Sequence, residues 1–248
     1  MKENSKRTVL ITGGSSGIGL ASAKKYIEQN YQVIIVGKTE DKLITAVNEI
    51  GGDISSYVVD VTQIDNLKDL YEQLWMQQIE IDILVTSAGL GKFGSVLDVS
   101  EKDYDLVMNT NTKGTFFTVS ILKPLIKRGG HVVLISSFLA SKHIPLTSVL
   151  SSSKIAVETF TKIFAREFLD DKIKVNAISP GSIKSNFMSF ANPTEEQQKI
   201  LTANMPKILL EKRGEAIQVA DAICFLTSEK ADYINGAILS VDGGISVS

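Results

Sequence analysis

Seven short runs of apolar residues, rich in β-branched side chains, alternate along the chain with longer segments of helical periodicity. The runs predict strands at residues 8–12, 32–36, 56–60, 83–86, 130–136, 174–178 and 238–241. The segments between them predict helices at residues 17–29, 42–50, 64–77, 101–126, 149–168 and 215–227. Runs such as 33–36 and 132–135 are apolar at every position, which is typical of parallel strands covered by helices on both faces. The alternation therefore predicts an α/β fold, a doubly wound Rossmann fold with a seven-stranded parallel sheet and helices on both faces.

The bulk composition narrows the class of protein. All 248 residues are expected to form one domain, because α/β folds reach this length as a unit and no Pro- or Gly-rich linker divides the chain. A net charge of −2 without a basic stripe gives no sign of a nucleic-acid surface. The single cysteine, Cys224, cannot form an intramolecular disulfide, and no apolar run reaches membrane-spanning length. We therefore expect a cytoplasmic protein without a metal site that binds neither nucleic acid nor membrane.

The most informative local motif follows the first predicted strand and opens the first predicted helix. It reads Thr12-Gly13-Gly14-Ser15-Ser16-Gly17-Ile18-Gly19. A backbone that approaches a pyrophosphate closely leaves no room for a Cβ, and the N–H groups at a helix N-terminus attract phosphate. Glycines also occur in ordinary strand-to-helix turns, but here strand, glycine spacing and helix follow in order within one β-α-β unit, which favours dinucleotide binding. The predicted phosphate-binding residues are Gly13, Ser15, Ser16, Gly17, Ile18 and Gly19.

The residues that follow the second predicted strand bear on the choice of cofactor. An acidic residue at this place would hydrogen-bond the ribose 2′-hydroxyl of NAD. Gly37, Lys38 and Thr39 include no acid, and the ammonium group of Lys38 could pair with the 2′-phosphate of NADP. We therefore expect NADP(H) in preference to NAD(H); the alternative for Lys38 is an ordinary solvated lysine.

One long segment interrupts the alternation of strands and helices. Residues 192–213 are polar at first, contain Pro193 and Pro206, and connect the sixth predicted strand to the last long helix. The segment would emerge at the carboxyl edge of the sheet, where ligands bind in open α/β folds. We expect a mobile lid over the substrate, and the alternative is a plain surface excursion.

Taken in order, these motifs resemble the short-chain dehydrogenase/reductase family from Thr8 to Gly244. Further similarity lies in Asp60-Val61, which in relatives lies beside the adenine, and in Thr86-Ser87-Ala88-Gly89, where the family has Asn-Asn-Ala-Gly. It continues in Asn111-Thr112-Lys113-Gly114, Ile135-Ser136-Ser137, Pro180-Gly181-Ser182-Ile183 and Val241-Asp242-Gly243-Gly244. The resemblance implies that the cofactor site also includes Asp60, Val61, Ala88, Gly89, Lys154, Pro180, Gly181 and Ile183.

The resemblance also implies a catalytic set of Asn, Ser, Tyr and Lys, with the last two in a Tyr-x-x-x-Lys pair. The matching motifs place the asparagine at Asn111, the serine at Ser137 and the lysine at Lys154. In relatives the lysine holds the nicotinamide ribose, the serine orients the substrate, and the tyrosine donates a proton to the carbonyl oxygen. Because positions four residues apart share one helix face, Lys154 should still reach the ribose.

The expected tyrosine is missing. Its position is Leu150, which lies four residues before the lysine and thirteen residues after the serine. None of the six tyrosines lies between Tyr104 and Tyr233, so a shift of register cannot restore the motif. Thr147, Ser151 and His143 are the nearest alternative donors. The two hydroxyls are weaker acids than a phenol, and a loop histidine without chemistry is the simpler interpretation of the third.

The loss of the phenol leaves three hypotheses. A positioned proton donor contributes about 10²–10⁴-fold in rate, so simple ketone reduction should be slow. The first hypothesis is an oxidoreductase with a modified site, acting on an iminium ion or a conjugated enone that needs little proton donation, with Leu150 as an apolar wall. The second is a catalytically impaired, cofactor-binding homologue that serves as a partner subunit or sensor. The third is a substitution introduced into an active reductase. The retained Asn111, Ser137 and Lys154 favour the first.

The substrate is expected to be a partly apolar small molecule. Loops at the carboxyl edge of the sheet carry Phe93, Leu139, His143, Ile144, Phe187 and Phe190, each of which could equally serve packing. In relatives the helices that correspond to 101–126 and 149–168 pair across subunits. The second of these is unusually apolar here, with Phe160, Ile163, Phe164 and Phe168. We therefore expect a homo-oligomer, either a tetramer or a dimer.

Overall fold

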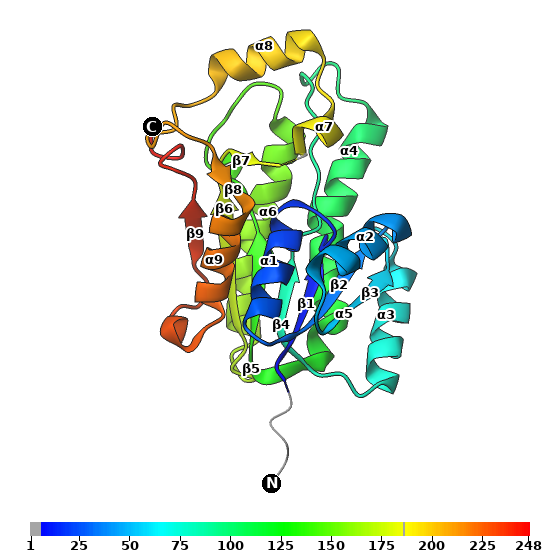
Figure 1. Cartoon of the computed structure of the whole chain (residues 1–248). Coiled ribbons are helices and arrows are strands. Elements are labelled where there is room, and N and C mark those ends of the chain that lie inside the picture. Colours follow the sequence, from blue (N-terminus) through cyan, green and yellow to red (C-terminus); the bar gives the residue numbers. More distant parts are fainter. Residues whose placement is uncertain (1–5, 186) are drawn as a thin grey trace.

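The centre of the molecule is a seven-stranded parallel sheet. A computed structural model describes residues 6–185 and 187–248. The strands lie in the order β3-β2-β1-β4-β5-β6-β9 (Figure 1). Their bounds are β1 (Thr8–Thr12), β2 (Gln32–Gly37), β3 (Ile54–Val58), β4 (Ile81–Thr86), β5 (Ile126–Ile135), β6 (Lys174–Pro180) and β9 (Ile238–Val241). The predicted doubly wound Rossmann fold is confirmed. Its edge strand β3 begins two residues earlier than predicted, because it pairs with β2 from Ile54 onward.

Helices cover both faces of this sheet. One face carries α1 (Gly17–Glu28), α2 (Glu40–Ile50) and α9 (Ala216–Leu226), and the other carries α3 (Ile64–Met76), α5 (Thr115–Leu122) and α6 (Ser148–Glu167). Along β2, Val33 and Ile35 pack on the first group while Ile34 and Val36 pack on the second. Each such side chain contributes roughly 1.5–3 kcal/mol on burial. Double-sided burial is therefore why residues 33–36 of the strand are all apolar.

The predicted helix 101–126 is wrong as one continuous element. The structure has α4 (Glu101–Met108), a π-helical turn (Asn109–Gly114), α5, and a 3₁₀ turn (Lys123–Leu125), and β5 begins at Ile126. Pro124 explains the end of the helix, because proline lacks the N–H that would continue the ladder. The π turn has a tertiary cause, since Asn111 within it bonds to the backbone of Leu90.

Short elements extend above the carboxyl ends of the strands (Figure 1). They are β7 (Ile183–Lys184), α7 (Phe187–Ala191), α8 (Glu195–Asn204) and β8 (Gly214–Glu215). Thr194 and Gln197 form a reciprocal capping box that starts α8. The Gln197 side chain also donates to the Phe93 carbonyl at 3.0 Å. The inserted segment thus lies over the sheet edge where it was expected, and its mobility stays a prediction.

A ladder of phenylalanine rings accounts for much of the apolar character of α6. The ring of Phe160 packs on Phe116, Phe164 packs on Phe160, and Phe168 packs on Phe164, with centroid separations of 5.4–5.7 Å. Of the four residues that suggested self-association, only Ile163 is half exposed, at 46%. The homo-oligomer therefore stays a prediction. Among the described residues, no helix is long and apolar enough to cross a membrane.

Candidate functional site

The site lies where the strand order reverses, between the carboxyl ends of β1 and β4. In doubly wound sheets this reversal opens a crevice for ligands. The loop after β1 and the loop after β4 touch closely. The Ala88 N–H donates to the Thr12 hydroxyl at 3.2 Å, and a Cβ on Gly13 would come within 2.8 Å of the Ala88 backbone. Gly13 is therefore required by packing between the two loops.

The glycine loop presents an open cradle at Gly17. This residue has a φ of +53°, and a Cβ built on it would meet nothing nearer than the Ser185 Cβ at 4.0 Å. Gly19 differs, because its Cβ would lie 2.3 Å from the Gly13 carbonyl oxygen. The Ser16 side chain does not cap the helix N-terminus within the described chain. The first turn of α1 and the open face of Gly17 thus fit a phosphate group of a dinucleotide.

The predicted adenosine-side residues gather at the ends of β2 and β3. The Ser15 hydroxyl lies 3.6 Å from the place that a Cβ on Gly37 would take, and the next residue, Lys38, is exposed. Asp60 accepts the Thr62 N–H at 2.9 Å through one carboxylate oxygen. Val61 is buried. Of these residues, none lines the main cavity described next.

A cavity of about 450 Å³ extends from the glycine loop to an apolar chamber. Its wall includes fifteen of the predicted site residues. They are Gly13, Ser16, Gly17, Ile18, Ala88, Gly89, Phe93, Ser137, Leu139, Leu150, Lys154, Pro180, Gly181, Ile183 and Phe187. The structure therefore brings together residues spread over most of the chain. No group of three His, Cys, Asp or Glu that could hold a metal lies among the described residues.

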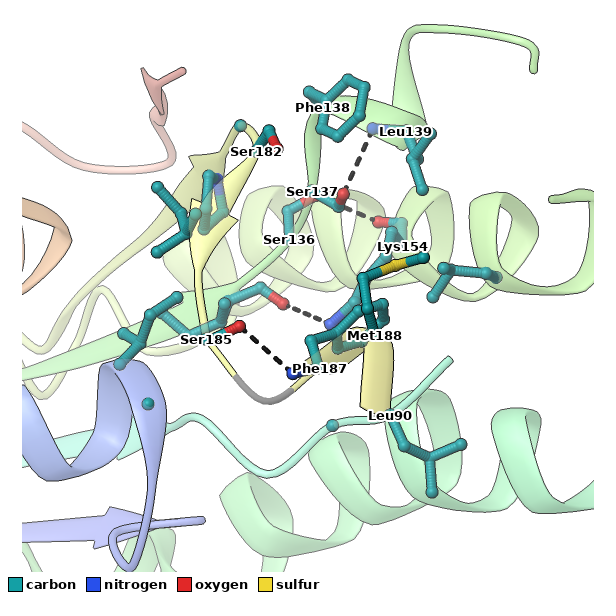
Figure 2. A pocket seen from close by; sticks show the side chains of 18 of the residues that line it. Leu90, Ser136, Ser137, Phe138, Leu139, Lys154, Ser182, Ser185, Phe187 and Met188 are labelled. Atoms are coloured by element: carbon teal, nitrogen blue, oxygen red, sulfur yellow. Dashed lines mark hydrogen bonds between the residues drawn. The ribbon is translucent and has the colours of Figure 1, made fainter. Parts of the chain in front are cut away.

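Lys154 forms a buried cation in the cavity wall (Figure 2). Its Nζ donates to the Ile135 carbonyl at 2.8 Å. Burial lowers the pKa of Lys154 to about 8, because desolvation disfavours the charged form. A Cβ on Gly89 would lie 3.5 Å from this nitrogen and 3.3 Å from the Asn111 Oδ1. The absence of a side chain at Gly89 thus leaves the approach to Lys154 clear.

Asn111 lies behind the cavity wall, where its side chain bonds to other parts of the protein, and it does not line the cavity. Its Oδ1 accepts the Leu90 N–H at 2.9 Å, and its Nδ2 donates to the Leu90 carbonyl at 2.9 Å and to the Ser153 hydroxyl at 3.0 Å. The side chain is fully buried. Asn111 therefore fixes the loop after β4 against α6, and the π turn supplies the bend that aims it there.

Two serines follow β5 directly and have different partners. The Ser136 hydroxyl donates to Glu158 at 2.8 Å, so its hydrogen is used within the protein. The Ser137 oxygen accepts the Leu139 N–H at 3.2 Å, which caps a 3₁₀ turn. As an acceptor in that contact, the Ser137 hydroxyl keeps its own hydrogen for a ligand in the cavity (Figure 2).

Leu150 occupies the position that a tyrosine would hold and is only 3% exposed. It belongs to an apolar cluster with Phe138, Leu139, Ile144, Leu201 and Ile245. A Cβ on Gly91 would lie 3.0 Å from the Leu150 Cδ2 and 2.5 Å from the Phe187 Cζ. Leu150, Gly91 and Phe187 are thus in close contact, which closes the apolar chamber from the side of α7.

The three alternative proton donors are not placed to replace the phenol. The Thr147 hydroxyl donates to the Ile144 carbonyl at 2.7 Å, and it lies 2.9 Å from the Ser151 hydroxyl. The hydrogen between the two hydroxyls must therefore come from Ser151, and both are used internally. His143 is exposed and lies outside the cavity lining, as does Ile144, which packs behind Leu150.

Several lining residues could not be found from the sequence. The apolar ones include Leu90, Phe138, Met188, Leu201 and Met205, and the polar ones include Ser182, Ser185, Gln198, Thr202 and Arg213. The inserted segment 192–213 indicated where this part of the cavity wall would lie, but its sequence did not indicate which of its side chains turn into the cavity. Phe190 was also predicted here, and its side chain lies outside the described part of the chain.

Comparisons with known proteins point to one group of enzymes. The profile of a family described as enoyl-(acyl carrier protein) reductase matches residues 13–246. The 3-oxoacyl-[acyl-carrier-protein] reductase FabG of Buchnera aphidicola subsp. Acyrthosiphon pisum is 33% identical over 242 residues, which cover 97% of each chain. Oxidoreductase asL5 of Sarocladium schorii is 31% identical over 242 residues, covering 97% of this chain and 96% of its own.

Solved structures agree with these sequence matches. A protein described as a short chain dehydrogenase/reductase family protein superposes with a TM-score of 0.85 at 30% identity, covering 99% of this chain and 100% of its own. Levodione reductase superposes with a TM-score of 0.88 at 25% identity and covers 98% of both chains. The matched range of 13–246 includes every residue of the cavity wall.

Proposed function

This chain belongs to the short-chain dehydrogenase/reductase family, and on that premise we propose that it is an NADP(H)-dependent oxidoreductase with an atypical active site. It transfers a hydride to a partly apolar carbonyl, enone or iminium acceptor. The observation that carries the proposal is the continuous cavity, which joins the open cradle at Gly17 to the apolar chamber at Leu150 and has Lys154 in its wall.

The cofactor half of the cavity fits a nicotinamide dinucleotide, which would supply the hydride. Gly17 and the first turn of α1 would bind the pyrophosphate. Lys154, whose Nζ is left accessible by the absence of a side chain at Gly89, would hold the nicotinamide ribose. Lys38 follows Gly37 at the end of β2, no acidic residue stands at residues 37–39, and its ammonium group supports NADP(H) over NAD(H).

The acceptor half fits an apolar molecule with one oxygen or an electrophilic carbon. Ser137 offers a hydroxyl hydrogen to a developing negative charge. No phenol stands beside it, and the hydroxyls of Thr147 and Ser151 are engaged within the protein. Positioning next to the hydride remains, and positioning alone supplies several kcal/mol of rate enhancement. The site therefore favours acceptors that need no strong acid during hydride transfer.

Nucleotide binding tests the proposal first. We expect NADPH fluorescence to change on mixing with the protein, with tighter binding for NADPH than for NADH. Lys154→Met should weaken NADPH binding about tenfold or more, because a charge-assisted contact is worth about 1.5–3 kcal/mol. Lys162→Met is the matched control, since Lys162 is an exposed lysine on the same helix. Absence of any binding by the unmodified chain would refute the proposal.

A second candidate function is a cofactor-binding partner subunit or sensor without turnover. It is favoured by one observation, namely that a buried leucine stands at the acid position while the nearby hydroxyls of Thr147 and Ser151 donate to protein acceptors. Single-turnover oxidation of bound NADPH, measured separately with a ketone, an enone and an iminium salt, distinguishes the two candidate functions. Oxidation with any of them supports the oxidoreductase, and tight binding with no oxidation supports the sensor.

A further inference from the structure

Arg213 is the last residue of the inserted segment 192–213, and its side chain lines the cavity. Its Nε donates to the Ser182 hydroxyl at 3.1 Å, and its Nη2 donates to the Ile183 carbonyl at 2.7 Å. Both acceptors are uncharged, and the third nitrogen, Nη1, has no acceptor within residues 6–185 and 187–248. The guanidinium group is therefore held in place while one of its nitrogens stays available for a ligand.

The pairing of β7 with β8 fixes Arg213 against the cavity wall (Figure 1). Ile183 lies opposite Gly214 in this pair, and the Gly214 N–H donates to the Ser182 carbonyl at 3.0 Å. A Cβ on Gly214 would come within 2.7 Å of the Ile183 Cδ1, so the absence of a side chain lets the two strands approach this closely. Because Arg213 directly precedes this glycine, its backbone position is set by β7.

The wall segment that binds Arg213 also borders the phosphate cradle. The Ser185 Cβ is the atom nearest to the place of a Cβ on Gly17, at 4.0 Å. Ser185 follows Ile183 by two residues, which is at most about 7 Å along the chain. Figure 2 shows Ser182 and Ser185 on this same segment. The anchor of Arg213 and the open face of Gly17 therefore belong to one stretch of the cavity wall.

No acidic side chain of the described residues neutralises the guanidinium group. Within 6–185 and 187–248, no aspartate or glutamate lines the cavity. Near Arg213 along the chain, Glu211 pairs with Lys207 at 3.4 Å and Glu215 pairs with Lys184 at 2.6 Å. The Asp242 carboxylate, which follows β9, accepts two backbone N–H groups of its own turn. The positive charge of Arg213 is thus left for an anionic ligand.

The two basic residues of the cavity wall belong to different parts of it. Lys154 comes from α6 and donates to the Ile135 carbonyl beside Gly89, where the nicotinamide ribose is proposed to lie. Arg213 lies on the side of β7, and there the diphosphate of a dinucleotide would place two negative charges in the Gly17 cradle. The N-terminus of α1 offers a positive charge of only about half an elementary unit. Arg213 is the lining side chain that can add a full charge on this side.

We infer that Arg213 binds the diphosphate of the dinucleotide. The inference rests on the proposed function and adds to its cofactor site a residue of the inserted segment, outside the glycine loop. The observation that carries it is a fixed guanidinium group without a carboxylate partner, on the wall segment that borders Gly17. Arginine suits this ligand, because its planar fork can donate to two phosphate oxygens at once.

This role differs from the one proposed for Lys38. The diphosphate is common to NADPH and NADH, whereas the 2′-phosphate is present only in NADPH. Arg213 should therefore set the affinity for both dinucleotides equally, and Lys38 should set the preference between them.

Equilibrium binding tests the inference without turnover. NADPH and NADH are titrated by fluorescence, and ADP-ribose, which has the diphosphate but no nicotinamide, is titrated by calorimetry. Arg213→Gln should weaken the binding of all three about fivefold, or about 1 kcal/mol, as for an exposed ion pair. The ratio of the NADPH and NADH affinities should stay as in the native chain. Lys212→Gln is the matched control, since it removes the same charge from an exposed neighbour outside the lining, and it should change each affinity less than twofold.

Two further measurements separate the charge of Arg213 from its contacts with β7. Arg213→Lys keeps the charge and should recover most of the lost affinity. If it binds ADP-ribose as weakly as Arg213→Gln does, the inference is overturned. Raising the KCl concentration from about 0.05 M to about 0.5 M should bring the native chain and Arg213→Gln within twofold of each other, because salt screens exposed charges. A difference that persists at high salt would point to a structural cause and overturn the inference.

The remaining outcomes are equally distinct. An unchanged affinity of Arg213→Gln for ADP-ribose would overturn the inference, and so would a changed ratio of the NADPH and NADH affinities, which would place the arginine at the 2′-phosphate. If the native chain fails to bind NADPH, the proposed function fails. If the native chain and Arg213→Gln bind NADPH equally well, only the inference fails.

Discussion

Replacing Leu150 by tyrosine should raise the reduction of simple ketones well above the slow rate expected of the native chain. The new phenol would stand one helical turn before Lys154 on α6 and next to a cavity of about 450 Å³. A positioned acid is worth about 10²–10⁴-fold in rate, or roughly 3–5 kcal/mol. Against this stands a packing cost, because Leu150 is only 3% exposed and packs in an apolar cluster with Phe138, Leu139 and Ile144. A larger ring there costs about 1–3 kcal/mol of stability unless it turns into the cavity.

Leu150→Phe is the matched control, since it has the same ring and the same packing cost but no hydroxyl. The assay is oxidation of NADPH with cyclohexanone, accompanied by urea unfolding of both variants. We expect the two variants to unfold within about 0.5 kcal/mol of each other, and only Leu150→Tyr to gain activity. An equal gain in both variants would show that ring shape, not proton donation, limits the native site. No gain in a folded Leu150→Tyr that still binds NADPH would refute the assignment of the acid position.

Three further predictions each rest on a single residue. Burial lowers the pKa of His131 from its ordinary 6.5 to about 4. As the pH drops from 6.5 to 4, the unfolded chain therefore binds a proton at this histidine that the folded chain does not. The free energy of unfolding should fall by up to about 3 kcal/mol over this range. His131→Gln should flatten this slope in urea unfolding, and an unchanged slope would contradict the assignment to His131. Gly91→Ala would place a methyl group 2.5 Å from the Phe187 ring, which should displace α7. The KM for the acceptor should then rise about tenfold, while the affinity for NADPH stays unchanged. An unchanged KM would contradict this contact. Lys38→Asp should reverse the preference for NADPH over NADH in fluorescence titrations, and a retained preference would place the 2′-phosphate elsewhere.

The sheet could be predicted because its strands have to satisfy two faces at once. A run such as Val33 to Val36 is apolar at every position only when helices cover both sides, and this property is local to the sequence. The break at Asn111 could not be predicted in the same way. Its cause is a pair of hydrogen bonds to Leu90, twenty-one residues earlier in the chain, which no local periodicity encodes.

The same distinction between local and long-range causes applies to the candidate site. Residues fixed by loops directly after strands, such as Gly17 and Ser137, were predicted from their motifs, and the structure places them in one cavity. Of the residues on α7 and α8, Phe187 was predicted, whereas Met188 and Leu201 were not, because these helices are short and only the fold decides which of their side chains turn into the cavity. Arg213 has no sequence signal at all, since its position depends on the carbonyl of Ile183.

Hydride transfer to 2-cyclohexen-1-one from NADPH deuterated at C4, prepared separately in each configuration, tests the proposed chemistry most directly. The native chain should yield cyclohexanone with deuterium on the carbon β to the carbonyl, from one of the two NADPH epimers. Cyclohexanone itself should not be reduced further at a comparable rate, because Leu150 provides no proton to the alkoxide. Deuterium on the carbonyl carbon, in an allylic alcohol, would contradict the account, as would bound NADPH that transfers no deuterium to the enone.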